Sequence, residues 1–534
     1  MTVLQNQDIR TLLQASSDPI WSRLSDVFGP EPQRLEERYQ VYSALVSEFE
    51  RLYGSSERFT LVRAPARINL KGVHIDHRGG HLNYMAIDRE IVIAVSPRND
   101  DLVSLHDHEE SRFAPRQFSI GAELAPNIRG NWLTYMDQVR LTTGDWSNYI
   151  RAGVLRLQDY CADRPLKGMN LLVTGNIPIA AGLSSSSALV VAAVEAALWV
   201  NGLSLPDDQK ATLCGEAEWL VGTRGGAGDH AAMIFGRRGH VVRLQFFPLT
   251  GEAIPFPPGY RVVVCDSLRK AHKADGARSA FNERIATYEF ALLLIKRLFP
   301  KLAPHLTYLR DLNTEQTNID LKTIYEILAA LPERITRDAL RRALPDQIAT
   351  LERLFRTHQE PPTGYRVRGV CLFGLAECER SRLYGEFLQQ EDMATVGELM
   401  YLSHDGDRVV SFNRDGIREP WNNETTDEYL ANLIDDAASV EVNRRLQAEL
   451  WRQPGAYGCS CEELDRIVDI ARTVPGVVGA NLTGAGLGGC VVALVREKNV
   501  TGLIDALANR YYGPQGLEPA TMVCSSVHGA GRIA

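Results

Sequence analysis

The sequence predicts a mixed α/β protein of two domains. Three observations support this prediction: a length of 534 residues, strand-like segments that alternate with long helical ones, and a strand, glycine/serine loop and helix in series. Single hydrophobic cores stop growing near roughly 250 to 300 residues, so a chain of this length should divide. Hydrophobic residues make up 45% and charged residues 23%, which is ordinary for globular proteins, so both parts should fold.

A helical extension is expected over residues 1–50, ahead of a first domain over residues 51–255. Apolar residues recur at helical spacing in the extension, beginning at Ile9, Leu12 and Leu13, and are interrupted by Gly29-Pro30-Glu31-Pro32. From Phe59 the pattern changes to the short strands FTLVRAPARINL and REIVIAVSPR. The first domain therefore begins with a sheet.

The middle of the first domain combines three elements. A strand over residues 169–174 leads into a glycine/serine loop over residues 177–187, and the segment ALVVAAVEAALWV follows. That segment is rich in Ala and Leu and lacks Gly and Pro, so it predicts a helix.

The second domain is expected over residues 256–534 and opens with a strand over residues 260–265. Helical patterns follow to about residue 410, with breaks at Pro300, Pro332 and Pro361-Pro362. Residues 405–435 are polar and contain Pro and Gly, so we interpret them as an insertion or a lid-like excursion.

Composition and charge exclude several function classes. The formal net charge of -8 offers no clustered positive surface for nucleic acid or an anionic membrane. The nine cysteines have no paired C-x-x-C spacing and suit small buried side chains in a reducing compartment. The N-terminal residues contain no secretory leader and no apolar run is long enough for a membrane helix, so a cytoplasmic protein is expected.

A phosphate-binding loop is predicted at Gly182-Leu183-Ser184-Ser185-Ser186-Ser187, just before the predicted helix. A helix start presents unpaired N–H groups and the positive end of the helix dipole, and hydroxyls can bind phosphate oxygens or Mg²⁺. The alternative is an ordinary serine-capped helix. The loop is not a Walker motif, because Gly-Lys-[Ser/Thr] is missing.

A second glycine cluster, Thr483-Gly484-Ala485-Gly486-Leu487-Gly488-Gly489, satisfies the pattern G-x-G-x-x-G. The apolar run that follows it predicts a strand, whereas a dinucleotide fingerprint opens a helix. We therefore expect a loop that packs against another loop or the substrate, with a plain hairpin turn as the alternative.

Phosphoryl transfer needs a group that orients or deprotonates the nucleophile, a cation and metal ligands. Asp229, Arg67 and Glu218 are candidates, although each alone could be a solvated charge. His74-Ile75-Asp76-His77 could suggest zinc, but polar side chains on one face suit sugar hydroxyls better.

Three motifs, in this order, resemble those of the galactokinase branch of the GHMP kinase superfamily. Residues 67–80 resemble the signature R-x-N-L-I-G-E-H-x-D-Y-x-x-G, Pro178 with residues 182–188 resembles the phosphate loop, and residues 482–490 resemble the C-terminal glycine motif. Residues 146–150 and 222–230 resemble two further family segments.

The resemblance implies a fold and a chemistry. The fold would be an N-terminal ribosomal-S5-like α/β domain and a C-terminal ferredoxin-like α/β domain, with the site between them. The activity would be ATP-dependent phosphorylation of the anomeric hydroxyl of a galactose-like sugar, with ATP and Mg²⁺ as cofactors and a small-molecule sugar as partner.

The resemblance also assigns roles to particular residues. Asp229 would be the base or the orienting carboxylate, and Arg67 would hold it ionised. Ser186 and Glu218 would be partners of Mg²⁺. The sugar would be bound by His74, Asp76, Gly228 and the positions of Val73 and Phe281; ATP would be bound by Trp146, Pro178, Gly182, Leu183, Ser184, Ser185, Ser186 and Ser187; the glycine motif comprises Gly484, Gly486, Gly488 and Gly489.

Two departures from the family concern the sugar. Val73 stands where galactokinases carry a Glu that binds the C6 hydroxyl, and Phe281 stands where they carry a Tyr. Galacturonate or arabinose could therefore replace galactose. A catalytically silent sensor of sugar and ATP, as occurs among galactokinase relatives, is the alternative to an active enzyme.

Overall fold

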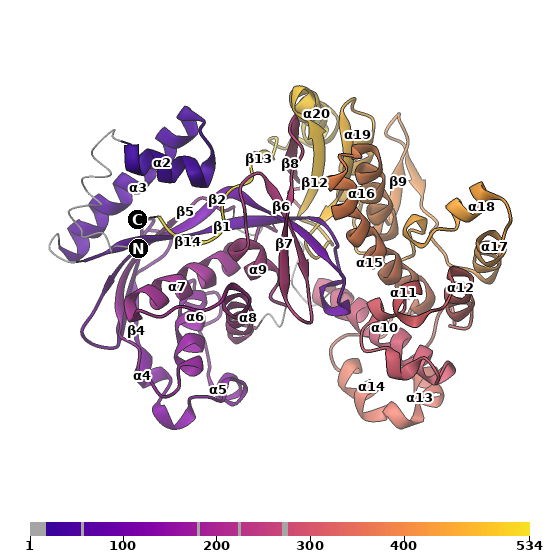
Figure 1. Cartoon of the computed structure of the whole chain (residues 1–534), viewed down its shortest axis with the longest axis horizontal. Helices are drawn as coiled ribbons and strands as arrows, with labels where there is room; N and C mark the ends of the chain where they lie inside the picture. The colour runs from indigo at the N-terminus through magenta and orange to yellow at the C-terminus, as the bar shows by residue number, and fades with distance from the viewer. Residues whose placement is uncertain (1–17, 55–57, 179–181, 223–225, 270–275, 534) are drawn as a thin grey trace.

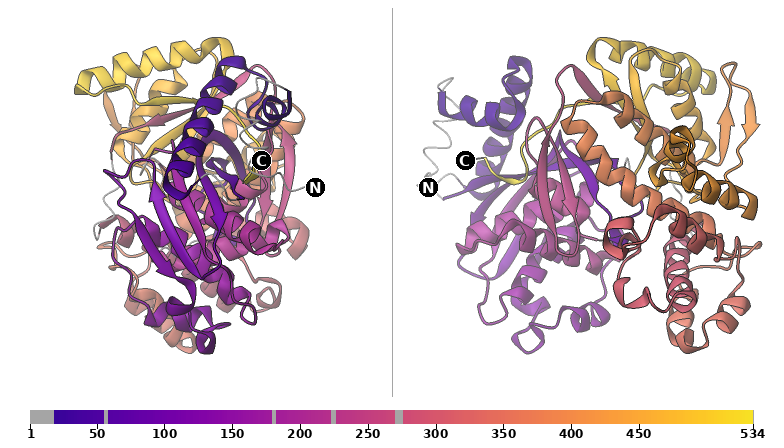
Figure 2. Two further views of the ribbon diagram at one scale, coloured as in Figure 1. Left: turned by 90° about the vertical axis from the view of Figure 1, so that its left-hand side faces the viewer. Right: turned by 45° about the vertical axis from the view of Figure 1, so that its right-hand side comes forward.

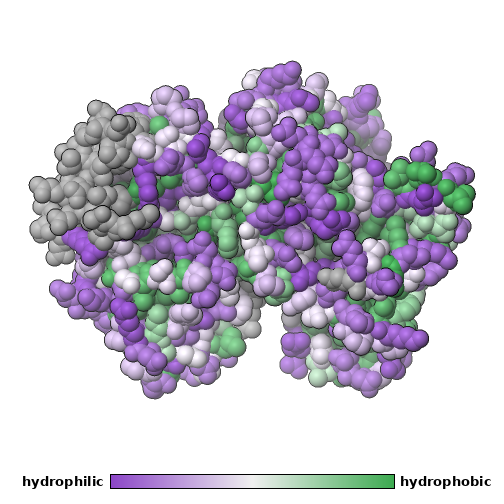
Figure 3. Space-filling view, in the orientation of Figure 1, coloured by the Kyte–Doolittle hydropathy of each residue, from purple (hydrophilic) through white to green (hydrophobic). Residues whose placement is uncertain are grey.

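The computed structural model describes residues 18–54, 58–178, 182–222, 226–269 and 276–533. The helical pattern predicted at Ile9, Leu12 and Leu13 lies outside these residues, as do three positions of the glycine/serine loop (179–181) and residues 223–225. Two domains lie side by side along the longest axis (Figures 1 and 2), and the surface is indented between them at its lower edge (Figure 3). None of the described helices is long and apolar enough to span a bilayer.

The first domain is built on a sheet of eight described strands, in which β14, β1, β2, β5, β3 and β4 are neighbours in that order. Strand β6 also pairs with β2, and β7 pairs with β6; all pairings are antiparallel except β3 with β5. The strands are β1 (Thr60–Lys71), β2 (Leu82–Pro97), β3 (Leu102–Asp107), β4 (Arg116–Ser119), β5 (Met169–Gly175), β6 (His240–Gln245), β7 (Thr250–Pro255) and β14 (Gly531–Arg532).

Helices cover both faces of this sheet because alternate residues of β2 point to opposite sides. Ile91, Ile93 and Val95 join one core and Val92 and Ala94 join another. The helices packed in or around the first core are α4 (Ile120–Glu123), α5 (Trp132–Gln138), α6 (Ser147–Tyr160), α7 (Ser185–Asn201), α8 (Asp207–Glu218) and α9 (Gly228–Ile234).

The described part of the N-terminal extension forms a third layer on the opposite face. Helices α2 (Asp18–Phe28) and α3 (Pro32–Tyr53) are separated at the predicted Gly29–Pro32 break and pack against the second face of β2 (Figure 1). The hydroxyl of Tyr42 donates to Glu90 of β2 at 2.9 Å, and Arg63 of β1 donates to the same carboxylate at 2.5 Å. The extension is therefore integral to the first domain.

The second domain has a smaller antiparallel sheet of order β11-β12-β8-β13, with helices around it. Its helices end before the prolines that were expected to break them: α10 before Pro300, α12 before Pro332 and α14 before Pro361. The elements are β8 (Tyr260–Asp266), α10 (Gly276–Leu298), α11 (Thr314–Thr317), α12 (Leu321–Ala329), α13 (Arg337–Ala343), α14 (Ile348–Phe355), α15 (Val367–Gln389), α16 (Met393–Asp407), β9 (Val410–Phe412), β10 (Arg418–Pro420), α17 (Asp427–Ala437), α18 (Val442–Gln447), α19 (Glu462–Arg472), β11 (Val477–Thr483), β12 (Cys490–Arg496), α20 (Val500–Leu507) and β13 (Thr521–Cys524).

Short turns of 3₁₀ helix, and one of π-helix at η9, connect these elements. They are η1 (Asp76–Arg78), η2 (Pro126–Ile128), η3 (Trp219–Val221), η4 (Ala303–His305), η5 (Leu309–Asp311), η6 (Pro345–Gln347), η7 (Leu450–Arg452), η8 (Glu497–Asn499), η9 (Ala508–Tyr512) and η10 (Gly513–Gln515).

The end of the chain returns to the first domain, which differs from the expected boundary at residue 256. After β13, Ser526 bridges Ile87, and β14 pairs with β1 through Arg532 opposite Val62. Val527 and Ile533 are buried beside the N-terminal helices. This return connection was not evident in the sequence, because β14 is two residues long.

Residues 405–435 do not form a separate lid-like excursion in the structure. They contain the end of α16, the β9–β10 hairpin and the start of α17. Asp465 of α19 accepts hydrogen bonds from the backbone N–H groups of Val409 and Val410, and Leu430 of α17 is fully buried. Polar composition was a poor guide here, since buried carboxylates satisfy the polar backbone of the segment.

Candidate active site

Arg67 of β1 and Asp229 of α9 form a bidentate ion pair although 162 residues separate them. Arg67 Nε donates to Asp229 Oδ1 at 2.7 Å, while Nη2 donates to Oδ2. Arg67 Nη1 donates to the backbone oxygen of Gly182 at 2.6 Å. The paired carboxylate and the glycine/serine loop are therefore held by one guanidinium, whose planar fork suits this geometry.

The surroundings of Asp229 keep its carboxylate ionised. Burial would raise its pKa, but the charge of Arg67 and hydrogen bonds from Arg67 and Ser184 lower that pKa to about 2. Ser184 Oγ donates to Oδ2 at 2.5 Å and the Tyr84 hydroxyl lies 3.4 Å from Oδ1. Because 28% of the Asp229 side chain remains exposed, a ligand can reach it.

The glycine/serine loop ends at the first turn of α7, as expected. Ser184 precedes this helix with a left-handed φ of 57°, and its side chain makes no capping hydrogen bond. An added Cβ at Gly182, whose φ is 74°, would meet no atom within 4 Å. Pro178 and Gly182 are exposed, Leu183 is buried, and Ser185 and Ser186 are partly exposed, so this helix start is open to a ligand.

Glu218, at the end of α8, lies against the same helix start. Its carboxylate accepts a hydrogen bond from Ser187 Oγ at 2.8 Å and lies 3.0 Å from His230 Nε2. Burial would raise the pKa of Glu218, yet His230 and hydrogen bonds from Ser187 and Ser186 lower it. The structure thus brings Ser186 and Glu218 together. The described residues contain no cluster of three or more metal-ligating His, Cys, Asp or Glu side chains.

Asp76 approaches the segment that contains Asp229. It begins η1, and a Cβ built on Gly226 would lie 3.4 Å from Asp76 Oδ2. A Cβ on Gly228 would lie 3.3 Å from the Tyr84 hydroxyl and 3.2 Å from Leu82 Cδ1. Glycine at these positions lets β2 and η1 approach the start of α9 closely.

Comparisons with known proteins agree with this geometry. The galactokinase galactose-binding signature matches residues 47–97, which include Arg67 and Asp76. GHMP kinases N terminal domain matches residues 148–237, which include the glycine/serine loop, Glu218 and Asp229, and GHMP kinases C terminal matches residues 434–513. The chain belongs to the galactokinase family. It is an ATP-dependent sugar kinase of the GHMP superfamily.

Relatives and a solved structure extend over nearly the whole chain. Galactokinases of Roseiflexus sp. (strain RS-1) and Dictyostelium discoideum are 29% and 26% identical over 92% of this chain and over 96% and 90% of their own lengths. Lactococcus lactis galactokinase complexed with galactose superposes with a TM-score of 0.65 at 22% identity, covering 92% of this chain and all of that one. The predicted two-domain α/β fold is confirmed.

Two residues of the galactokinase-family signature have side chains buried against the second domain. Val73 is 2% exposed and belongs to the core of the second domain. The ring of His74 stacks on Tyr457 with centroids 4.3 Å apart, and its Nε2 lies 3.4 Å from Asp407. With 2% of its side chain exposed, His74 has no open face for a sugar hydroxyl, so we omit it from the proposed sugar site.

Two further candidates, Phe281 and Trp146, lie on or next to helices. Phe281 is half-buried on the second turn of α10. Trp146 precedes α6, donates from Nε1 to the backbone oxygen of Ala114 at 3.2 Å and packs edge-on to Phe113. Their contacts with sugar and adenine stay predictions.

The second glycine cluster joins β11 to β12, which confirms its rejection as a dinucleotide fingerprint. Leu487 N donates to the backbone oxygen of Cys459 at 2.7 Å, and a Cβ on Gly486 would lie 2.1 Å from that oxygen. Thr483 Oγ1 donates to the backbone oxygen of Asn69 in β1 at 3.1 Å. Close packing against another loop, one of the two expectations, is what the structure has.

Sequence reasoning assigned no role to two residues that contact the site, Tyr84 and His230. Tyr84 lies on β2, and no spacing in the sequence relates its hydroxyl to Asp229. His230 directly follows Asp229, but only the fold brings it to Glu218. Their roles depend on strand pairing and helix packing.

Proposed function

We propose that this galactokinase-family chain transfers the γ-phosphoryl group of ATP to the anomeric (C1) hydroxyl of galactose or another sugar of galacto configuration. The products are the sugar 1-phosphate and ADP, and galacturonate and arabinose are candidate substrates beside galactose. The observation that carries the proposal is the Arg67–Asp229 pair, because it combines an ionised, partly exposed carboxylate with a bond to the glycine/serine loop.

Asp229 would accept a hydrogen bond from the C1 hydroxyl and orient its oxygen toward the γ-phosphorus. A new bond forms between these two atoms as the bond from phosphorus to the β–γ bridging oxygen breaks. An effective general base titrates near the working pH, whereas the pKa of Asp229 is about 2. We therefore assign Asp229 mainly to orienting the hydroxyl, whose proton passes to solvent as the phosphorus–oxygen bond forms.

Residues at the start of α7 fit a triphosphate and Mg²⁺. The open space at Gly182 and the uncapped helix start leave N–H groups and serine hydroxyls available to phosphate oxygens. Ser186 and Glu218 would hold Mg²⁺, which takes oxygen ligands and commonly only one or two carboxylates. When bound, Mg²⁺ would neutralise charge on the phosphates.

The sugar would contact Asp76, Gly228 and Phe281. The Glu that binds the C6 hydroxyl in galactokinases is replaced here by the buried Val73, so that acceptor is missing, and an unpaired buried hydroxyl costs about 1 to 3 kcal/mol. A C6 carboxylate would need a cation, yet Lys71 binds Glu377 and Arg78 pairs with Glu289. Because both cations already pair with carboxylates, the site favours a sugar without a charged C6 group.

A coupled assay of ADP release tests this proposal with galactose, arabinose, galacturonate and N-acetylgalactosamine. We expect turnover, with a higher kcat/KM for arabinose than for galactose. Asp229→Asn measures background ATP hydrolysis. Sugar binding by calorimetry without ADP release from any sugar would overturn the proposal in favour of a silent sensor.

A further inference from the structure

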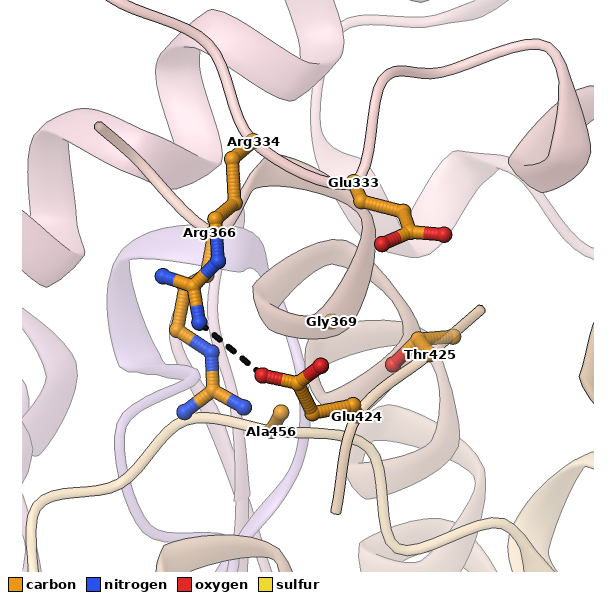
Figure 4. Close-up of a pocket in the computed structure, with 7 residues that line it drawn as sticks. All are labelled: Glu333, Arg334, Arg366, Gly369, Glu424, Thr425 and Ala456. Carbon is orange, nitrogen blue, oxygen red and sulfur yellow. Dashed lines mark hydrogen bonds and ion pairs between the residues drawn. The ribbon is translucent and has the colours of Figure 1, made fainter. Parts of the chain in front are cut away.

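A second candidate binding site lies in the C-terminal domain, at the start of α15 (Figure 4). It is a small cavity that opens to solvent. Arg334 and Arg366 lie on one side of it, with Glu424 facing them (Figure 4). The lining residues are Glu333, Arg334, Arg366, Gly369, Glu424, Thr425 and Ala456.

Both carboxylates of the cavity already have basic partners. Glu424 pairs with Arg334 at 3.2 Å, and Glu333 lies 3.4 Å from Arg368. Arg366, in contrast, donates to the neutral side-chain oxygen of Asn423 at 2.9 Å, and no carboxylate in the described part of the chain pairs with it. Arg366 therefore has no ion-pair partner among the described residues, although the negative charge of Glu424 acts on it from nearby.

Further cations surround Arg366. A Cβ built on Gly458 would lie 3.7 Å from Arg284 Nη2 and 3.9 Å from Arg366 Nη1, so both guanidinium groups flank this glycine. Burial, followed by the like charges of Arg334 and Arg284, lowers the pKa of Arg366. Arginine stays protonated in proteins, so the repulsion persists, and the negative charge of Glu424 opposes it only in part.

Neutral donors converge on the same place. Arg366 is the N-cap of α15, a helix of 23 residues, and makes no side-chain cap, so the positive end of the helix dipole faces the cavity region. Beside it, Asn423 Nδ2 is buried and has no hydrogen-bond acceptor in the described part of the chain. A buried donor without a partner is costly and indicates a missing acceptor.

We propose that this cavity binds a phosphate group, with Arg366 as the principal cation and Arg334 beside it. The guanidinium of Arg366, the free amide donor of Asn423 and the start of α15 supply donors to several oxygens of one tetrahedral anion. The site is separate from the glycine/serine loop, which belongs to the other domain.

Calorimetric titration with inorganic phosphate tests this site in the full-length protein. Saturating ADP and Mg²⁺ are present throughout, so that the phosphate loop is occupied. We expect one phosphate to bind the unaltered protein and Arg366→Gln to weaken that binding at least tenfold. Arg356→Gln is the matched control, because Arg356 is an exposed arginine that follows α14 in the same domain.

A second variant guards against loss of folding in Arg366→Gln. Arg334 is on the surface, with 35% of its side chain exposed, so Arg334→Gln should fold. It frees Glu424 to face Arg366 and should also weaken phosphate binding severalfold. Equal phosphate affinity in the unaltered protein and both variants, or no binding to the unaltered protein at millimolar phosphate, would overturn the proposal. A repeat with glucose 1-phosphate in place of phosphate distinguishes a sugar phosphate from free phosphate as the preferred ligand.

Discussion

Strand β1 carries two basic residues that form ion pairs of opposite character. Arg67 pairs with Asp229, whose side chain is 28% exposed, whereas Lys71 pairs with Glu377 and both side chains are completely buried. Only three residues of β1 thus lie between a charge pair that is open to ligands and one that is sealed between the domains. The comparison shows that an ion pair that remains partly exposed can act on a ligand, whereas one that is fully buried holds the two domains together.

The buried pair is satisfied by neighbours from several elements. Glu377 of α15 accepts hydrogen bonds from Lys71 Nζ at 2.9 and 2.8 Å, Gly72 N at 3.2 Å, Arg380 Nε at 2.8 Å and Ser403 Oγ at 3.0 Å. Burial lowers the pKa of Lys71 to about 7 although Glu377 opposes that shift. This carboxylate connects the sugar signature to the second domain.

Removing the charge of Asp229 should have the largest effect on turnover. Asp229→Asn keeps the size of the side chain but weakens its hold on the C1 hydroxyl, and kcat should fall by about 10²-fold because the hydroxyl is less well positioned. Steady-state kinetics gives kcat, and calorimetry should find sugar and ATP binding retained. Asp137→Asn, on the exposed side of α5, is the control. A near-normal kcat in Asp229→Asn would refute the assignment.

Glu377→Gln changes the buried pair, and we expect it to lower the stability of the fold rather than to act on turnover directly. Lys71 and Arg380 would lose their carboxylate in a sealed environment, and breaking a buried pair costs about 3 to 5 kcal/mol. Chemical denaturation followed by circular dichroism measures the change. An unaltered midpoint would show that the pair contributes no stability.

A double-mutant cycle isolates the Lys71–Glu377 interaction. Lys71→Met and Glu377→Gln should each destabilise, and the double variant should be more stable than the sum of the two losses predicts, because neither partner is then left alone. Additive losses would mean that Glu377 acts through Arg380 and Ser403 alone.

The Arg67–Asp229 pair could be predicted from the sequence, whereas the buried Lys71–Glu377 pair could not. Asp229 and Arg67 lie in local motifs whose residue types suit phosphoryl transfer, and the Ser-rich run precedes a helix that periodicity predicts. Glu377 lies inside a long helix, 306 residues from Lys71, and no local pattern relates them. Val73 and His74 lie in the signature that predicted sugar contacts, but their side chains are buried against the second domain.

Acid should weaken the Arg67–Asp229 pair. The pKa of Asp229 falls from about 3.9 in an unfolded chain to about 2 in the fold, so its ionisation adds stability above pH 4 that is lost as pH falls through 2. Relative to Asp229→Asn, the unaltered protein should lose about 1 kcal/mol between pH 5 and pH 3. Denaturation of both proteins at each pH measures the difference. A constant difference would mean that the pKa of Asp229 is not lowered by folding.

Ser186→Ala should reduce turnover less than Asp229→Asn does, and it tests how the Arg67–Asp229 pair is linked to ATP. It removes one hydroxyl from the first turn of α7, next to Glu218, and a lost hydrogen bond to a charged group is worth about 1.5 to 3 kcal/mol. We expect kcat/KM for ATP to fall at least tenfold at limiting Mg²⁺. Unfolding should be unchanged, because the N-cap residue of α7 is Ser184 and its side chain makes no cap. Ser47→Ala is the control for loss of a helical serine, because Ser47 lies on the exposed side of α3. Loss of folded protein with normal kinetics in the surviving fraction would instead assign Ser186 to holding the helix start, and the proposed contact with Mg²⁺ would then be wrong.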